Sequence, residues 1–360
     1  MDLRILTVPG DGIGTEVTRE AVRVLERVCS RYGHKLFLTE ALLGGIAIHK
    51  TGTPFPDETR RLALEADATL MGAVGLPEFD TLSPDKRPEK GLLGIRQAMG
   101  VYANLRPVRT YAALIDSSPL KNHLVEGTDM IIVRELTGGI YYGTPRGITG
   151  QGDEERAVNT MTYTRAEIAR ITRMAFQLAR NRRKKLTSVD KSNVLECSQH
   201  WRKVVLEVAP EFPDVALDHL LVDNCAMQLV LNPKRFDVVV TENMFGDILS
   251  DEGAVLAGSI GMLPSASLGD RKPSGVWVGL YEPVHGSAPD IAGQGKANPL
   301  GAIGSVAAML EYSFGLKQEA AAVNAAMEQV LNSGRVTADL KPKGAPATTS
   351  EVGTAVCEAI

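Results

Sequence analysis

The sequence predicts an α/β protein of two lobes that is built on parallel or mixed sheets and does not have a standard Rossmann fold. The chain has 360 residues, which is long for a single hydrophobic core, so two lobes are expected. Apolar segments of strand length alternate with segments of helical spacing, which favours a largely parallel sheet. The first glycines fall at positions 10, 12 and 14, with Thr15 where a dinucleotide fingerprint has its third glycine.

The first third of the chain predicts three strands and two helices. After the tight turn 9–14, apolar residues recur at helical spacing as far as Gly33, which we expect to end that helix. Residues 77–88 are rich in Pro, Asp and Ser and predict a surface loop that could act as a lid. The expected strands are 3–8, 36–38 and 68–72, and the second expected helix is 58–66.

The middle and last thirds continue the alternation. Thr164 and Glu167 form a capping box that opens a helix reaching about Lys185. The segment 148–156 is polar and predicts only a loop. The loop 282–299 is rich in Gly, Pro and Ala, and we expect it to fold closely around a ligand. Further strands are expected at 129–133, 186–189, 219–222 and 236–240, and further helices at 197–208, 300–312, 319–331 and 350–360.

Composition and charge exclude several classes of protein. Apolar residues make up 44% and charged residues 23%, as in ordinary globular proteins, and a net charge of −4 argues against nucleic-acid binding. No apolar run approaches the ~18 residues of a membrane span, and the amino terminus lacks a signal peptide. The cysteines form no metal or disulfide pattern, so we expect free thiols in the cytoplasm; they are Cys29, Cys197, Cys225 and Cys357.

A basic run, Arg180–Lys185, has two interpretations. It could bind nucleic acid, but it also closes a predicted helix, where cations complement the helix dipole. The second interpretation is favoured.

Charged residues follow the four apolar strands of the middle third, where parallel strands place ligand sites. They are Arg134, Lys191, Asp223 and the pair Asp247 and Asp251. One helical turn separates the last two, so they share a helix face and could bind one Mg²⁺, Mn²⁺ or Ca²⁺ ion through oxygen. A solvated acidic face is the alternative for this pair alone. The repeated pattern favours a metal that is chelated by a small acidic substrate.

These segments resemble the β-decarboxylating dehydrogenases of the isocitrate/isopropylmalate dehydrogenase family. The resemblance covers nearly the whole chain, and its most specific segments are Leu92–Arg96, Asn104–Pro107, Val133–Tyr141, Asp190–Leu195, Asn243–Glu252 and His285–Gly293. It implies an isopropylmalate dehydrogenase-like fold in which residues 1–101 and 258–360 form an NAD-binding lobe. Residues 102–257 would form a second lobe with the metal site and the dimer interface.

The resemblance also implies the roles of the reacting residues. A Mg²⁺ or Mn²⁺ ion on Asp223, Asp247 and Asp251 would bind the substrate hydroxyl and the neighbouring carboxylate as a Lewis acid. Lys191 would be the base, directly or through water, and Tyr141 the acid that leads to protonation of the product. Planar guanidinium groups would bind the substrate carboxylates; these belong to Arg96, Arg106 and Arg134.

The implied reaction converts 3-isopropylmalate to 2-oxo-4-methylpentanoate (2-oxoisocaproate) and CO₂ in leucine biosynthesis. Leu92 and Leu93 match the family members that act on isopropylmalate, and Glu89 and Val194 match positions near the same pocket. An apolar pocket discriminates by only ~1–3 kcal/mol per methylene, so D-malate, tartrate and homoisocitrate stay open as substrates. A non-catalytic metal or nucleotide binder that kept the fold is a further alternative.

For the cofactor, the resemblance implies NAD. Asp290 matches the position that bonds the adenosine ribose, where a carboxylate would repel a 2′-phosphate. The other residues implied to bind NAD are Gly75, His285, Gly286, Ser287, Ala288, Ile291 and Asn298. A homodimer is also implied, with Lys191 and Asp223 reaching the site from the neighbouring subunit.

Overall fold

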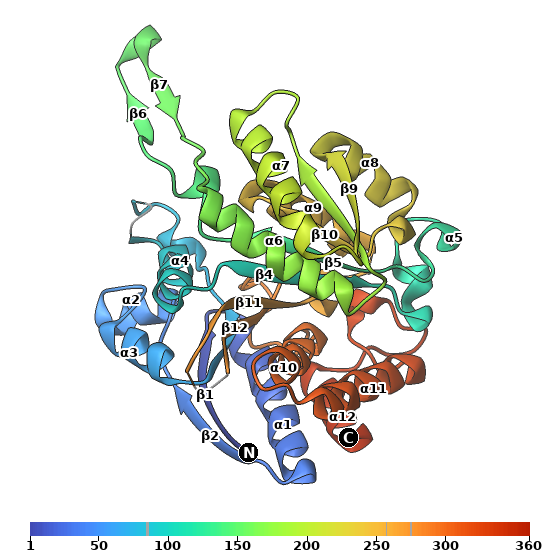
Figure 1. Cartoon of the computed structure of the whole chain (residues 1–360). Coiled ribbons are helices and arrows are strands. Elements are labelled where there is room, and N and C mark those ends of the chain that lie inside the picture. The colour runs from blue at the N-terminus through green and yellow to red at the C-terminus, as the bar shows by residue number, and fades with distance from the viewer. Residues whose placement is uncertain (84–85, 257, 274–275) are drawn as a thin grey trace. The chain divides into compact units, whose positions relative to one another are not determined.

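Two compact units make up the structure, a computed structural model that describes residues 1–83, 86–256, 258–273 and 276–360 (Figure 1). The first unit comprises Met1–Val101, Tyr111–Pro119 and Ala257–Ile360, and the second comprises Tyr102–Thr110 and Leu120–Leu256. The prediction assigned all of residues 102–257 to the second lobe, whereas Tyr111–Pro119 belongs to the first unit. The roles predicted for the two lobes stay predictions, and residues 84–85 of the predicted lid lie outside the described residues.

Five strands lie side by side in the first unit, in the order β2-β1-β3-β12-β11. The first four are parallel, because β1 pairs in parallel with β2 and β3, and β3 does so with β12. The last, β11, is antiparallel to β12. These strands are β1 (Asp2–Gly10), β2 (Lys35–Glu40), β3 (Ala68–Ala73), β11 (Pro264–Arg271) and β12 (Trp277–Pro283).

Helices cover both faces of these strands. Neighbouring residues of a strand point to opposite faces. Gly72 of β3 approaches Thr18 of α1, whereas Met71 points into a cluster with Ile95 of α4. The helices of this unit are α1 (Gly14–Tyr32), α2 (Gly45–Thr51), α3 (Asp57–Glu65), α4 (Pro88–Met99), α10 (Leu300–Tyr312), α11 (Lys317–Ser333) and α12 (Thr349–Ala359), with 3₁₀ turns at Pro77–Phe79, Ala112–Ser117, Ile260–Met262 and Ala338–Leu340.

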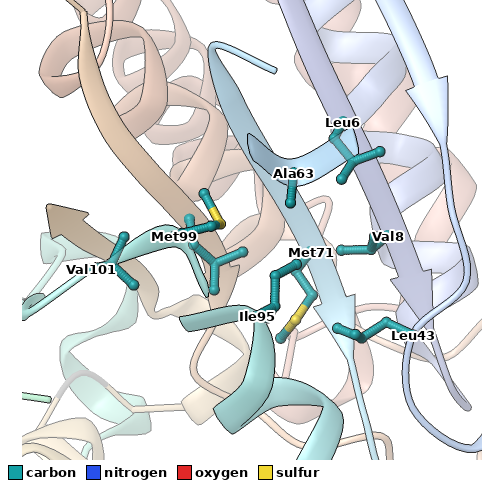
Figure 2. Packing of buried hydrophobic residues seen from close by; sticks show 9 residues of the cluster. Leu6, Val8, Leu43, Ala63, Met71, Ile95, Met99 and Val101 are labelled. Atoms are coloured by element: carbon teal, nitrogen blue, oxygen red, sulfur yellow. The ribbon is translucent and has the colours of Figure 1, made fainter. Parts of the chain in front are cut away.

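The buried cluster beneath α4 holds that helix against the sheet (Figure 2). Ile95 and Met99 of α4 are 0% and 7% exposed and pack with Val8 and Met71 of the strands. Burying a side chain of this size stabilises the fold by about 1.5–3 kcal/mol. This packing therefore fixes the position of α4 and of those residues on it that were predicted to bind substrate. The other members of the cluster are Leu6, Leu43, Ala63, Val101 and Leu280.

The second unit has the same kind of strand arrangement, in the order β4-β5-β10-β8-β9. Strands β5, β10, β8 and β9 are parallel, and β4 runs antiparallel to β5. These strands are β4 (Ala103–Arg109), β5 (Asp129–Glu135), β8 (Lys185–Asp190), β9 (Ala216–Leu221) and β10 (Val238–Thr241). A separate antiparallel hairpin of β6 (Gly147–Thr149) and β7 (Arg156–Val158) extends away from them (Figure 1).

In the second unit, too, helices lie on both faces of the strands. Thr187 and Ile132 are both in register with Val239, so they share a face, and Ile132 lies next to Gly253 of α9. Ser188 points to the other face, where Trp201 of α7 donates to it. The helices are α5 (Asn122–Val125), α6 (Arg165–Arg180), α7 (Glu196–Val208), α8 (Val222–Leu231) and α9 (Asn243–Leu256), with 3₁₀ turns at Gly139–Tyr141, Gly152–Glu154, Ala209–Glu211 and Pro233–Arg235.

The predicted fold class is confirmed, with mostly parallel strands, mixed edges and helices on both faces. Gly33 ends α1 with φ +73°, and Thr164 opens α6 with the predicted capping box. Three details of the prediction were wrong. Helix α6 ends at Arg180 rather than near Lys185, the strand before Asp223 ends at Leu221 rather than at residue 222, and the 148–156 segment contains parts of β6 and β7. Asp223 follows that strand as predicted and lies in the first turn of α8. No helix among the described residues is long and apolar enough to cross a membrane.

The early end of α6 also changes the interpretation of the basic run. Beyond the helix, Arg182 donates to the buried Asp237 carboxylate at 2.8 Å, and the Arg183 backbone N–H donates to it at 2.9 Å. The Arg183 side chain also lies 3.5 Å from Asp237, so this carboxylate pairs with both cations beyond the helix end.

Candidate active site

The two aspartates predicted to bind a metal lie on α9, one turn apart. Helix α9 begins directly after β10, and Glu242 fixes its first turn. The Glu242 carboxylate accepts hydrogen bonds from the backbone N–H groups of Phe245 at 2.8 Å and Met244 at 3.1 Å. Asp247 and Asp251 follow at side-chain exposures of 33% and 62%, so both carboxylates are accessible to a ligand.

Asp247 joins two of the other predicted residues. Its Oδ1 atom accepts a hydrogen bond from Arg134, and its Oδ2 atom accepts one from the Tyr141 hydroxyl at 3.0 Å. Burial, and then the Asp247 charge, raise the pKa of the Tyr141 hydroxyl above its usual value of 10.0. Tyr141 therefore keeps its proton at neutral pH and can act as an acid.

Arg134 is held on its other side by Asn243. The Asn243 Oδ1 atom accepts hydrogen bonds from Arg134 Nε at 3.0 Å and Nη2 at 2.8 Å, and its Nδ2 donates to the Gly138 carbonyl at 3.1 Å. Asn243 thus links Arg134 to the segment that leads into Tyr141.

Arg106 lies beside the same acidic face. It donates to Asp251 at 3.1 Å and to Ser250 at 2.7 Å through Nη1, which is also 3.7 Å from Asp247. Its Nε donates to Asn104 at 2.9 Å. The second unit therefore gathers two arginines, two aspartates and one tyrosine, all predicted from the sequence.

Lys191 and Asp223 form a separate pair in the second unit. The Lys191 Nζ atom is 2.5 Å from Asp223 Oδ1, and this bond lowers the pKa of the Asp223 carboxyl. The Asp223 side chain is 57% exposed. Val194, three residues after Lys191, is 60% exposed.

The three predicted metal ligands are not assembled within one chain. Among the described residues there is no group of three or more His, Cys, Asp and Glu side chains that could hold a metal ion. Asp247 and Asp251 provide two hard oxygen donors on one helix face, which suits Mg²⁺ or Mn²⁺. The predicted third ligand, Asp223, pairs with Lys191 instead.

The predicted substrate residues of the first unit lie on α4. Arg96 is ion-paired with Glu282, and its buried Nε has no hydrogen-bond partner among the described residues. Leu92 is partly buried and packs against the cluster beneath the helix, and Leu93 is also partly buried. Leu92 therefore contributes to the core as well as to any substrate pocket.

The predicted ligand loop was 282–299; its first two residues, Glu282 and Pro283, belong to β12, and residues 284–299 contain turns but no helix or strand. His285 is buried; its Nδ1 contacts the Gly286 carbonyl at 2.9 Å, and its Nε2 has no partner among the described residues. Burial lowers the pKa of this imidazole. Asn298 is anchored by Asp339 at 3.0 Å, whereas Asp290 is exposed. Ala288 has a positive φ of 36°, and Gly286 and Ile291 lie in the same loop.

Gly75 is a meeting point of predicted residues. It follows β3 with φ +127°. A Cβ atom placed on it would lie 3.3 Å from Glu89 Oε1 and 3.5 Å from Ser287 Oγ. The structure thus brings Gly75, Glu89 and Ser287 together from three separate segments of the first unit.

Comparison with known proteins identifies the family of the chain. The model of the isocitrate/isopropylmalate dehydrogenase family matches residues 4–356. The chain belongs to this family. It is 60% identical to 3-isopropylmalate dehydrogenase from Geobacillus kaustophilus (95% of this chain, 91% of the relative) and 56% identical to the protein of that name from Halalkalibacterium halodurans (100% and 98%). The solved isocitrate dehydrogenase of Methylococcus capsulatus matches with a TM-score of 0.85, 36% identity and coverage of 99% and 98%.

Membership in the isocitrate/isopropylmalate dehydrogenase family confirms the resemblance and makes the protein an enzyme of the decarboxylating dehydrogenase type. Sequence reasoning did not assign roles to Asn243, which holds Arg134, or to Glu282, which holds Arg96. Both lie in segments that had been singled out, but neither residue type suggests such a contact by itself. Only the fold shows their partners.

Proposed function

We propose that the protein catalyses the NAD-dependent oxidative decarboxylation of 3-isopropylmalate to 2-oxo-4-methylpentanoate, with release of CO₂, in leucine biosynthesis. The observation that carries this proposal is the Asp247 cluster, in which Arg134, Arg106 and Tyr141 surround two carboxylates of α9. Such a cluster suits a substrate with two carboxylates, a hydroxyl group and a carbon atom that must be protonated. The relatives named 3-isopropylmalate dehydrogenase support the choice of substrate.

Each residue has a role that fits its surroundings. Arg106 and Arg134 bind carboxylate oxygens in the second unit, and Arg96 does so in the first. Lys191 takes the proton of the 2-hydroxyl group, directly or through water, while C2 loses a hydride to NAD⁺. The bond from C3 to its carboxylate then breaks, and its electron pair stays on the substrate as an enolate. Tyr141, protonated at neutral pH, is the acid that leads to protonation of C3.

Asp247 and Asp251 are proposed to hold Mg²⁺ or Mn²⁺ together with the partner subunit's Asp223. A bound divalent cation would supply Lewis-acid polarisation of the substrate oxygens. Asp247 pairs with Arg134 and Asp251 pairs with Arg106, so both carboxylates lie beside the guanidinium groups proposed to bind the substrate.

The cofactor is proposed to be NAD, bound through the loop 284–299 and the segment around Gly75. Asp290 is exposed, so its carboxylate is accessible to the adenosine ribose, and it would repel a 2′-phosphate. The buried, unpartnered Nε2 of His285 and the anchored Asn298 support an adenine contact on the same loop.

A homodimer is proposed because the second unit exposes an apolar surface on the helices that carry the aspartates. Its residues recur at helical spacing and are 40–62% exposed; they are Met227, Val230 and Leu231 on α8 and Ile248 and Val255 on α9. Exposed apolar residues grouped in this way mark interaction sites. A two-fold contact through this surface would bury it and bring α8 of each chain to α9 of its partner.

Subunit complementation tests the dimer and the source of Lys191 together. Lys191→Ala and Asp247→Asn homodimers are each expected to be inactive. In a mixed dimer, one of the two sites would combine an intact Asp247 with the partner subunit's intact Lys191. Mixing equal amounts and allowing exchange should restore about a quarter of wild-type activity, since about half of the dimers are mixed and each has one intact site. No restored activity would contradict catalysis across the interface.

The substrate is tested by NADH formation with metal-stripped protein. We expect turnover only with added Mg²⁺ or Mn²⁺, and fastest turnover with 3-isopropylmalate among that acid, isocitrate, homoisocitrate, D-malate and tartrate. Faster turnover of another acid would keep the mechanism and change the substrate. An absence of turnover with all of them would reject the proposed function in favour of a binding protein. The predicted cytoplasmic location stays a prediction.

A further inference from the structure

The turn 9–14 contains a buried carboxylate that accepts hydrogen bonds from the backbone of two other segments. Asp11 is 3% exposed. Its Oδ2 atom accepts hydrogen bonds from the backbone N–H groups of Gly45 at 2.7 Å and Gly75 at 2.9 Å, and its Oδ1 atom accepts one from Ile46 at 2.8 Å. Hydrogen bonds to an ionised acceptor are about twice as strong as neutral ones. Asp11 therefore ties the end of β1 to the start of α2 and to the segment after β3.

One of these bonds ends at a residue of the cofactor region. Gly75 lies next to the side chains of Glu89 and Ser287, within 3.3–3.5 Å of the position of its absent Cβ atom. Its φ of +127° is a conformation that residues with side chains rarely adopt. The Asp11 carboxylate holds this backbone in place through the Gly75 N–H group.

The same turn also contacts the loop 284–299 directly. The Ile13 N–H donates to the Ser287 carbonyl at 2.8 Å. Gly12, with φ +54°, approaches so closely that a Cβ atom would lie 2.1 Å from the Ser287 oxygen. One helical turn later, the buried Glu16 accepts a hydrogen bond from the Gly295 N–H at 3.2 Å. The turn and the start of α1 thus hold this loop at two points.

We propose that the turn 9–14 shapes the dinucleotide site. Asp11 is a positioning residue that holds the backbone of Gly75, and Gly12 makes the contact that fixes the position of Ser287. This inference rests on the proposed NAD site and extends it to a segment whose glycine spacing departs from the dinucleotide fingerprint. The glycines of this turn allow segments of the protein to approach each other closely, whereas the fingerprint glycines allow the backbone to approach a pyrophosphate closely.

Matched glycine variants separate displacement of Ser287 from simple backbone strain. Gly12→Ala adds a methyl group against the Ser287 carbonyl. Gly33→Ala adds one at a similar φ of +73°, with nothing within 4 Å. NADH binding is measured by fluorescence titration of the metal-free protein, and the thermal midpoint is recorded for each variant. We expect Gly12→Ala to weaken NADH binding at least about tenfold and Gly33→Ala to leave it within about twofold of wild type.

Matched carboxylate variants test Asp11 in the same way. Asp11→Asn turns an NH₂ group toward at least one of the three backbone donors. Asp237→Asn changes another buried carboxylate that accepts backbone N–H groups, in the second unit. We expect Asp11→Asn to raise the Kd for NADH and the KM for NAD about tenfold while the KM for isopropylmalate changes less than twofold. Asp237→Asn should lower the thermal midpoint without raising the KM for NAD selectively over the KM for isopropylmalate.

Three results would overturn the inference. They are wild-type NADH affinity in both Gly12→Ala and Asp11→Asn, equal weakening in the two control variants, and equal changes in the KM for both substrates. If Asp11→Asn does not fold, the two glycine variants decide alone. Failure of the wild-type protein to bind NADH would instead overturn the proposed function, and the inference with it.

Discussion

Asn243 accepts two hydrogen bonds from Arg134 through a single oxygen atom, at 3.0 Å from Nε and 2.8 Å from Nη2. Its amide nitrogen meanwhile donates to the Gly138 carbonyl, three residues before Tyr141. A residue of the helix that carries the two aspartates therefore orients the arginine proposed to bind substrate and the segment of the proposed acid.

Asn243→Asp should weaken substrate binding more than turnover. The aspartate keeps the acceptor for Arg134 but places a second carboxylate beside it, which competes with the substrate for the guanidinium group. We expect the KM for 3-isopropylmalate to rise about tenfold, with a smaller change in kcat. Steady-state kinetics measure both, and the exposed Asn181→Asp is the control. An unchanged KM would show that Asn243 does not orient Arg134.

Tyr141→Phe should remove the proton donor while leaving the other contacts of the cluster. Loss of a general acid lowers turnover by about 10²–10⁴-fold, and NADH binding should not change. Because burial and then the Asp247 charge raise the pKa of Tyr141, loss of activity through its ionisation should occur at higher pH than for an ordinary tyrosine. A pH profile of kcat checks this, with Tyr142→Phe as the neighbouring control. A variant with wild-type turnover would exclude Tyr141 as the acid.

Ile248→Asp should prevent dimer formation. It places a charge in the apolar surface of α8 and α9, where Ile248 is 58% exposed. We expect a monomer in analytical ultracentrifugation and loss of turnover, because Lys191 and Asp223 would no longer reach a neighbouring site. Leu64→Asp is the matched control, since Leu64 is 53% exposed on α3 of the first unit. A dimeric Ile248→Asp variant would place the interface elsewhere.

Asp290→Ala should reduce the preference for NAD over NADP. Removing the carboxylate removes repulsion of the 2′-phosphate and a bond to the ribose. We expect the ratio of kcat/KM values to fall at least about tenfold. The exposed Asp270→Ala should leave the ratio unchanged. An unaltered ratio in Asp290→Ala would mean that other residues determine the cofactor.

His219 and His285 should each contribute to the free energy of unfolding in a way that increases as the pH rises toward 6.5. Burial lowers the pKa of both imidazoles below the ordinary value of 6.5. The folded state then binds fewer protons than the unfolded state. The contribution of these histidines to the free energy of unfolding therefore increases as the pH rises toward 6.5 and decreases as the pH falls below 6.5. His219→Leu should reduce this slope in denaturant unfolding at pH 5 to 8, whereas the exposed His123→Leu should not. An identical slope in both variants would contradict the assignment.

Much of this could be predicted from the sequence because the signals are local. Apolar periodicity placed β1, β3, β5, β8 and β10, although β4, β11 and β12 were not predicted. The capping box placed the start of α6, and Gly33 placed the end of α1. The one-turn spacing of Asp247 and Asp251 follows from helix geometry alone. Where a local rule was extended too far, as for α6 beyond Arg180, specific contacts of Asp237 with Arg182 and Arg183 took precedence.

The sequence by itself determined the fold class, the family and the residue types of the site. The tertiary structure decided which of these residues meet: Tyr141 and Arg134 at Asp247, Gly75 with Glu89 and Ser287, and Lys191 with Asp223 apart from the other aspartates. Spacing along a chain fixes neighbours only within one helix or strand. Contacts between distant segments depend on strand order and packing, which single residues do not encode.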